Sequence, residues 1–136
     1  MTHPQSTQWA ALILRVSLGV MYLAHSVLLK VLTFGLSGTA QWFASVGFPA
    51  ELAYGVAFAE IIGGTMLLLW VYTRWVALAL IPILLGALTV HWANGWVFSA
   101  QGGGWEYPLF LVSASIAQFL LGNGAFALSK TVTQPT

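Results

Sequence analysis

The sequence contains no cysteine, and this absence removes a whole group of chemistries. Disulfide bonds, thiolate metal sites and cysteine nucleophiles are all excluded. Charged residues are also scarce, at 5% of 136 residues, whereas a soluble domain carries about 25%. The formal net charge is only +1, and no basic cluster exists to neutralise phosphates, so nucleic acid is not an expected partner. Any redox chemistry would need a cofactor, a lipid-soluble substrate or a partner protein.

Hydrophobic residues make up 59% of the chain. The few polar side chains cannot cover a surface that faces water. The composition therefore predicts an integral membrane protein that is embedded in the lipid bilayer. Residues 1–136 are expected to form one domain. The first eight residues contain no Lys or Arg. We therefore expect no cleavable signal, and we interpret the apolar run that follows as the first membrane helix.

Four apolar segments are each close to the ~20 residues that a helix needs to cross a bilayer. They are residues 9–32, 52–72, 75–96 and 106–128, and the last segment has a break at 122–124. Pro82 predicts a kink in the third helix. Residues 38–47 are too few to span, and Trp42, Phe43 and Val46 would share one face of a short helix in the membrane interface. The predicted fold class is all-α, an integral membrane four-helix bundle with a short interfacial helix between helices 1 and 2.

Charge placement predicts the orientation in the membrane. Arg74 and Lys130 lie on one side of the predicted topology, and the loop 97–105 has no Lys or Arg. The positive-inside rule then places both termini in the cytoplasm. Lys30 lies on the other side and opposes this assignment weakly.

Glu60 is the residue that the composition explains least, because it lies in the middle of the apolar run 52–71 and is one of only three acidic residues. An ionised side chain near the bilayer centre costs roughly 2.5–3.5 kcal/mol or more. Glu60 must therefore be protonated, be paired with a cation, or face a wet internal cavity. Gly63 and Gly64 follow it, and small residues allow a neighbouring backbone to approach closely.

Polar residues form a stripe along the first predicted helix, within about 80° of one another at 100° per residue. They are Arg15, Gly19, Tyr22, Ser26 and Lys30, with His25 to one side. The other helices present comparable small or polar faces, formed by Ala53, Ala57, Glu60, Gly63 and Gly64, by Ala87, His91, Asn94 and Gly95, and by Glu106, Ser113 and Ala117. These faces predict a bundle with a polar interior.

A rise of ~1.5 Å per residue places Lys30, Glu60, His91 and Glu106 in the outer half of the bundle and Arg15 in the inner half. Such a mixture of carboxylates, a lysine and histidines suits hydrogen bonding to a quinone head group or proton relay. We predict that Glu60 and His91 are the catalytic proton carriers. The residues predicted to bind the quinone are Arg15, Tyr22, His25, Lys30 and Glu106.

Structural alternatives stay open for several of these residues. Lys30 and Glu106 lie near the interface, where long side chains snorkel to water. His91 has the alternative of a hydrogen-bonded core histidine, and Arg15 that of an ion pair with Glu60 that neutralises both. The sequence has no HxxxH or ExxH signature, so no tightly bound metal is expected.

With these residues identified, the chain resembles the DoxX family of small bacterial membrane proteins. The resemblance covers residues 14–127 and is carried by 15–19, His25, Lys30, 47–49, 59–64, 73–74, 102–107 and 122–124. It implies a four-helix protein of the bacterial inner membrane. Some members are similar to the membrane subunit of a thiosulfate:quinone oxidoreductase, and others are linked to oxidative-stress complexes at the membrane.

The leading hypothesis is a redox-associated subunit that interacts with quinone. Its electrons would come from a donor such as a small sulfur compound, through another protein subunit or the outer loop. Two alternatives differ in class. One is a non-enzymatic scaffold that docks a redox partner or forms a homo-oligomer, in which the polar interior serves packing alone. The other is a proton-coupled transporter that uses Glu60 as a protonation switch.

Overall fold

The computed structural model describes residues 4–124, and every regular element within that range is helical. The elements are α1 (Pro4–Leu23), the π-helix η1 (Ala24–Thr33) that continues it, α2 (Leu36–Ser45), α3 (Leu52–Leu68), α4 (Thr73–His91), the 3₁₀ helix η2 (Trp92–Asn94) and α5 (Glu106–Leu121). The all-α prediction is confirmed, and so is a short helix between the first two long ones.

Several predicted helix bounds need correction. The first helix begins at Pro4 and not at residue 9, because proline is well suited to a first helical turn. The second helix ends at Leu68 and not at 72, because Trp70 and Tyr72 adopt positive φ angles of 65° and 48°. A right-handed helix cannot continue through that conformation.

The last two helices also differ from the predicted bounds. α4 begins at Thr73, and its α-helical part ends at His91, where the predicted helix ran from 75 to 96. Pro82 lies inside α4. α5 ends at Leu121, before Gly122 with a φ of 77°. The predicted extension to 128 lies outside the described residues.

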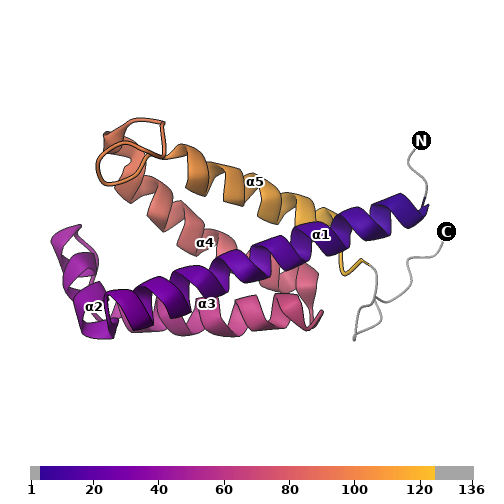
Figure 1. Ribbon diagram of the computed structural model, residues 1–136, viewed down its shortest axis with the longest axis horizontal. Helices are drawn as coiled ribbons and strands as arrows, with labels where there is room; N and C mark the ends of the chain where they lie inside the picture. The colour runs from indigo at the N-terminus through magenta and orange to yellow at the C-terminus, as the bar shows by residue number, and fades with distance from the viewer. Residues whose placement is uncertain (1–3, 125–136) are drawn as a thin grey trace.

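The long helical segments run antiparallel to their neighbours (Figure 1). The most extensive contacts join α4 to α5 and α1 to α3. At one end of the molecule, Gly124 lies against Ala11, so the end of α5 meets the first half of α1. We call this the turn end, since residues 69–72 connect α3 to α4 there. The opposite end holds α2 and the loop 95–105, and we call it the cavity end.

Glycines allow α1 and α3 to approach closely, as the sequence predicted for Gly64, whereas Gly63 faces the side chain of Leu80 on α4. A Cβ atom on Gly64 would lie 3.1 Å from the carbonyl oxygen of Gly19, and a Cβ on Gly19 would lie 3.0 Å from that of Gly64. The two backbones therefore touch at this level, which small residues permit between membrane helices.

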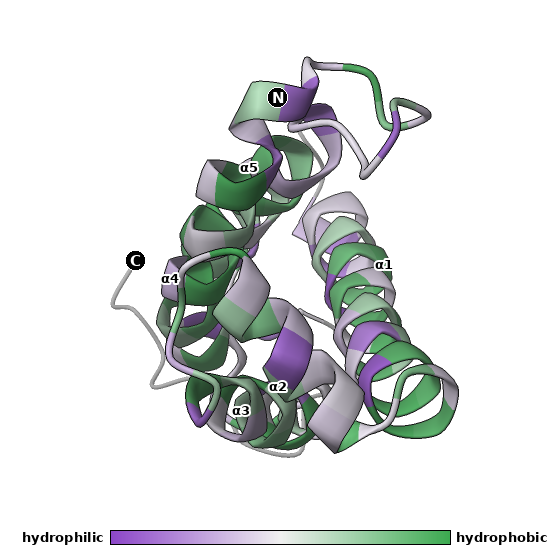
Figure 2. Ribbon diagram, turned by 90° about the vertical axis from the view of Figure 1, so that its left-hand side faces the viewer, coloured by the Kyte–Doolittle hydropathy of each residue, from purple (hydrophilic) through white to green (hydrophobic). Residues whose placement is uncertain are grey.

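The apolar core lies between the long helices and is formed by Leu18, Tyr22, Leu67, Val76, Leu80, Leu84, Leu111 and Ala114. A second small cluster of Ala40, Phe43 and Ala53 attaches α2 to α3. Phe43 is thus 8% exposed, where the sequence placed it on an interfacial face with Trp42. Trp42 itself is 46% exposed. Viewed from the cavity end, α2 lies across the end of the molecule, between α1 on one side and α4 and α5 on the other (Figure 2).

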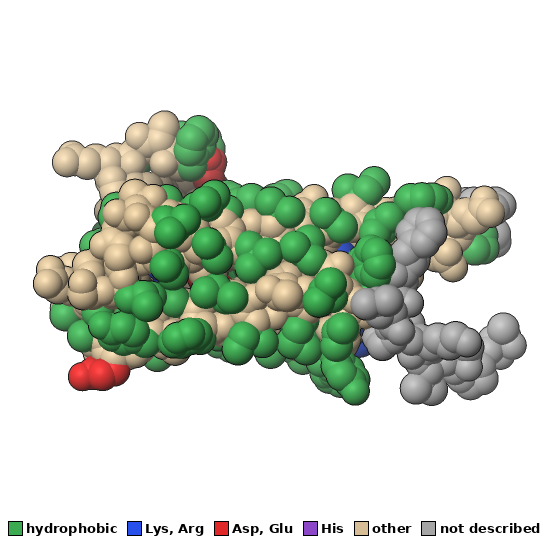
Figure 3. All heavy atoms as spheres, turned by 60° about the horizontal axis from the view of Figure 1, so that its bottom comes forward, with side chains coloured by type: hydrophobic (Ala, Val, Ile, Leu, Met, Phe, Trp, Pro, Cys, Tyr) green, Lys and Arg blue, Asp and Glu red, His purple; other side chains and the backbone are tan. Residues whose placement is uncertain are grey.

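Apolar side chains also dominate the outside of the molecule. In the face shown in Figure 3 they run along its length, and the acidic side chains visible there gather near one end. Two described helical stretches, Pro4–Thr33 and Thr73–Asn94, are long and apolar enough to cross a membrane. α3 and α5 are also apolar but shorter, at 17 and 16 residues.

Candidate functional site

The π-helix η1 positions three polar side chains at the cavity end. Its wider turn is defined by bonds between residues five apart, such as that from Phe34 N to the carbonyl of Leu29 at 2.8 Å. π-Helical turns are rare and are frequently found at functional sites. Within η1, Ser26 donates to the carbonyl of Tyr22 at 2.5 Å, and His25 Nδ1 donates to that of Met21 at 3.0 Å.

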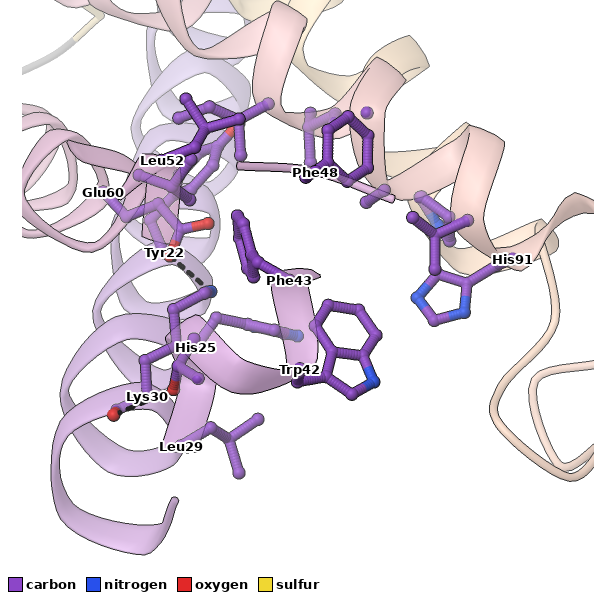
Figure 4. A pocket seen from close by; sticks show the side chains of 18 of the residues that line it. Tyr22, His25, Leu29, Lys30, Trp42, Phe43, Phe48, Leu52, Glu60 and His91 are labelled. Atoms are coloured by element: carbon purple, nitrogen blue, oxygen red, sulfur yellow. Dashed lines mark hydrogen bonds and ion pairs between the residues drawn. The ribbon is translucent and has the colours of Figure 1, made fainter. Parts of the chain in front are cut away.

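Glu60 is paired with Lys30, whose Nζ lies 2.7 Å from its Oε2 (Figure 4). The side chains are 6% and 16% exposed, respectively. This pair corrects two alternatives from the sequence. Lys30 turns inward and does not snorkel to the surface, and the ion-pair partner of Glu60 is Lys30 and not Arg15. A pair removed from water in this way neutralises a charge that an apolar interior would otherwise disfavour.

The pair lies on the wall of a cavity of about 840 Å³. α1, η1, α2, α3, α4 and α5 all contribute to its lining. Five of the predicted site residues line it: Tyr22, His25, Lys30, Glu60 and His91. His91 lies across the cavity from the Lys30–Glu60 pair (Figure 4). Its Nδ1 donates to the carbonyl of Gly102 at 3.0 Å, so it is tied to the loop 95–105 and is not a core histidine.

Comparison with known proteins places the chain in a family. The DoxX family matches residues 10–92. The chain belongs to the DoxX family. Members of this family are membrane-associated. Over 129 residues the chain is 33% identical to "Putative oxidoreductase CatD" of Bacillus subtilis strain 168, an alignment that covers 94% of this chain and 90% of that protein. No solved structure matches the chain.

Two of the predicted binding residues of this DoxX protein lie outside the cavity lining. Arg15 is fully buried toward the turn end, where Nη1 donates to the carbonyl of Leu67 at 3.4 Å and the guanidinium lies 4.4 Å from the Trp70 ring centre. Glu106 accepts a bond from the backbone N–H of Phe98 at 3.0 Å. The Glu106 side chain thus holds the loop 95–105 against the start of α5, and it does not line the cavity.

The sequence assigned the inward face of α4 in part, since Ala87 and His91 line the cavity, and assigned that of α5 incorrectly. Ser113 is exposed and donates to the carbonyl of Leu109, so its hydroxyl is satisfied by its own helix. The buried polar residues of α5 are Ser115 and Gln118. Asn94, at the end of η2, is exposed and donates to the carbonyl of Gly103. Both helices are apolar on nearly all sides. A single serine in the sequence therefore could not show which face of the helix is buried.

Apart from Tyr22, the tyrosine, tryptophan and phenylalanine residues of the cavity were not predicted as site residues. The ring of Tyr107 stacks on His25, with centroids 5.7 Å apart and planes inclined by 19°. Trp42, Phe43 and Phe48 cover the cavity from the side of α2 (Figure 4). Tyr107 could have been predicted as a site residue, because it follows Glu106 at the start of the last helix. The aromatic residues of 42–48 could not, because their spacing fits a helix in the membrane interface equally well.

Two hydroxyl groups at the cavity remain without a partner in the part of the chain that the structure describes. They are the buried phenol oxygens of Tyr22 and Tyr107. A buried hydroxyl without a hydrogen bond costs about 1–3 kcal/mol. Both oxygens are fully buried behind the cavity lining, so a ligand reaches either hydroxyl only after the side chain turns. Within residues 4–124, no three metal-ligating side chains come together.

Proposed function

We propose that this chain is a redox-associated membrane protein that binds a quinone in the 840 Å³ cavity. The observation that supports this most is the combination of an apolar lining with a few polar groups on one wall. The polar group exposed to the cavity is the Lys30–Glu60 pair, and Tyr22 and Tyr107, whose hydroxyls are buried, belong to the same lining. Ligand sites typically have volumes of about 300–1,000 Å³ and orient their ligands with a small number of polar groups.

The same proposal includes a membrane-spanning four-helix bundle formed by α1 with η1, α3, α4 and α5. Large apolar side chains on their outer faces support it, since Ile13, Phe58, Phe110 and Leu120 are 58–70% exposed. In water such a surface would be an aggregation liability, whereas in lipid it is the expected one. α3 and α5 reach about 24–26 Å at 1.5 Å per residue, close to the thickness of the hydrocarbon core. A bacterial inner membrane with both termini in the cytoplasm remains our proposal.

The residues present fit a quinone head group by their hydrogen-bonding chemistry. A quinone, when bound, supplies two-electron and two-proton redox chemistry. The ammonium group of Lys30 and the phenols of Tyr22 and Tyr107 are donors, which is what carbonyl oxygens require. The carboxylate of Glu60 would hold or release a proton beside them. The aromatic side chains of α2 would exclude water from the head group.

The electrons would come from outside this chain. No cysteine is available for thiol chemistry, so a partner subunit would deliver electrons from a donor such as a small sulfur compound. The name of the Bacillus subtilis relative, an oxidoreductase, supports a redox role in general terms. A scaffold whose polar interior serves packing alone would not need a cavity of this size.

A binding measurement with phenol-deletion variants tests the proposal. Purified protein in detergent is titrated with a water-soluble short-chain quinone, and binding is followed by equilibrium dialysis. We expect Tyr22→Phe and Tyr107→Phe each to weaken binding about 2- to 10-fold, the value of one hydrogen bond at 0.5–1.5 kcal/mol. Each variant keeps its ring, so packing is preserved. Tyr54→Phe is the matched control, because Tyr54 is exposed on α3 and outside the cavity lining.

Two outcomes would contradict the proposal. One is the absence of saturable binding by the wild-type protein. The other is equal affinity of all three variants and the wild type, which would place the quinone elsewhere.

A further inference from the structure

The helices that enclose the cavity are joined beside it at all but one of their long junctions. α1 touches α3 at Gly19 and Gly64, and η1 is tied to α3 by the ion pair. α4 and α5 pack against each other extensively. The first helical segment meets α5 where the ring of His25 stacks on that of Tyr107. Between α3 and α4, the described residues form no hydrogen bond, ion pair or ring contact beside the cavity.

α3 and α4 touch near the turn end and separate toward the cavity end. A Cβ atom built on Gly63 would lie 2.7 Å from Leu80 Cδ1, so the two helices are in close contact at that level. Figure 1 shows them spreading apart toward the end that holds α2. Pro82 follows this contact by two residues on α4. Proline inside a helix removes one backbone hydrogen bond and crowds the preceding turn, which favours a change of direction where the helices part.

Beyond that contact, the facing sides of both helices line the cavity. The residues are Leu52 and Val56 on α3 and Ile83, Gly86 and Val90 on α4. None of them has a polar side chain. Gly86 borders open space, because a Cβ atom built on it would meet nothing within 4 Å. We call this gap between the first half of α3 and the second half of α4 the α3–α4 seam.

The seam continues from the polar wall of the cavity into an apolar region. Because the helices are antiparallel, the Gly63–Leu80 contact puts Ile83 at about the level of Glu60. Gly86 then lies about 4.5 Å nearer the cavity end. A ligand whose polar head is held at the ion pair would therefore have the rest of its length beside Gly86.

The outside of the seam has the character of a surface that faces lipid. Residues 52–59 and 82–90 contain no charged side chain. Phe58 on α3 is 58% exposed and Leu85 on α4 is 46% exposed. Exposed apolar side chains of this size are expected in hydrocarbon and not in water.

We propose that a lipid-soluble quinone enters the cavity sideways from the bilayer through the α3–α4 seam, and that its apolar tail stays there beside Gly86 and Val56. The end of the cavity is less suited to a tail, because α2 folds across it and places Trp42 and Phe43 over the opening. The placement of the quinone rests on the function proposed above, whereas the opening of the seam to lipid does not.

The opening to lipid is measured without a ligand. The chain contains no cysteine, so Gly86→Cys can carry a single nitroxide spin label in protein reconstituted into liposomes. Molecular oxygen concentrates in hydrocarbon, whereas a neutral nickel chelate stays in water, and each relaxes the label that it meets. We expect oxygen to relax the label at position 86 to within about two-fold of a label in Phe58→Cys, and the nickel chelate to have little effect.

Ala114→Cys supplies the buried reference for this measurement, because Ala114 lies in the apolar core. A label at position 86 that oxygen relaxes no more than the label at 114 would mean that the seam is closed to lipid. A label relaxed mainly by the nickel chelate would mean that the cavity opens to water. Either result would overturn the proposal.

The position of the tail is measured with two quinones that share one ring, one with a decyl chain and one without it. Gly86→Leu would fill the space assigned to the tail, so we expect it to weaken binding of the decyl quinone about ten-fold more than binding of the ring alone. Each variant is compared with the wild type, so partition of the quinones into detergent cancels. Gly55→Leu is the matched control, because Gly55 also borders open space but lies outside the cavity lining.

Gly38→Leu tests the other route, past α2. Gly38 lines the cavity, and a Cβ atom there meets only Phe34 Cβ, at 4.0 Å. A selective loss of the decyl quinone in Gly38→Leu, or equal losses of both quinones in Gly86→Leu, would overturn the placement of the tail. If the wild type binds neither quinone while the label at 86 meets lipid, the proposed function fails and the lateral opening stands.

Discussion

At the scale of single residues, the scarcity of charge makes each ionisable side chain informative. Glu60 and Lys30 lie 30 positions apart in the sequence, yet they form a 2.7 Å pair in an apolar setting. The other carboxylate of the predicted site, Glu106, is instead satisfied by a backbone N–H of the loop 95–105. The difference lies in what each side chain meets when the helices pack, and not in the residue type.

The pair makes a prediction about stability. Glu60→Gln or Lys30→Met alone leaves one charge without its partner, which costs up to about 3–5 kcal/mol when the pair is buried. The double variant removes both charges, so we expect a coupling energy of about 1–3 kcal/mol in a double-mutant cycle. The measurement is denaturant unfolding in mixed micelles.

The control for this cycle combines Lys30→Met with Glu106→Gln. Glu106 bonds to Phe98 N and not to Lys30, so these two effects should add within about 0.3–0.5 kcal/mol. A Lys30–Glu60 coupling as small as that of the control would mean that the ion pair does not persist.

At the scale of the elements, the contact between α1 and α3 holds the pair in register. Gly19 and Gly64 bring the two backbones together, and Tyr22 and Glu60 lie on the same contact one turn toward the cavity end. Beyond that level, α1 passes into η1, whose wider turn changes the direction of each following side chain. The position of Lys30 thus depends on both the glycine contact and the π-helix.

Gly64→Ala tests the contact between these helices. The added methyl group would lie 3.1 Å from the carbonyl oxygen of Gly19, so the helices must separate slightly, at an expected cost of about 1–3 kcal/mol in unfolding free energy. Gly55→Ala is the control on the same helix, because a methyl group there meets nothing within 4 Å. It should leave stability unchanged or raise it by up to ~1 kcal/mol. Equal loss in both variants would exclude close packing at Gly64.

At the scale of the whole molecule, the structure separates two ends of different character. The cavity end holds α2, the loop 95–105 and the Lys30–Glu60 pair, and the turn end holds Arg74 and the start of α1. Lys30 is now weaker evidence against the predicted orientation, because its charge is paired with Glu60 inside the molecule. Lys130, the other residue used for orientation, lies outside the described residues.

This arrangement predicts which end faces the cytoplasm. If the positive-inside rule holds, the cavity end faces outward. Gln101→Cys, on the exposed loop 95–105, should then react with a membrane-impermeant maleimide in intact spheroplasts. Tyr72→Cys, 64% exposed at the turn end, should react only after the membrane is permeabilised. The reverse pattern would invert the topology.

The sequence by itself determined the all-α fold class, the existence of the long helices and the inward faces of α1 and α3. These follow from local rules. Helical periodicity placed Arg15, Gly19, Tyr22, Ser26 and Lys30 on one stripe, and the structure buries four of them completely or almost so. The strong contrast between that stripe and its apolar surroundings made the phase of α1 unambiguous.

Only the tertiary structure decided which charged residues meet. The choice of Lys30 over Arg15 as the partner of Glu60 depends on how far α1 slides along α3, and no periodicity within one helix contains that information. The phase of α5 also came from packing, since its apolar residues leave Ser113 and Ser115 equivalent in sequence and opposite in space. The cavity exists because α2 folds across the end of the helices, which is a contact between segments distant in the chain.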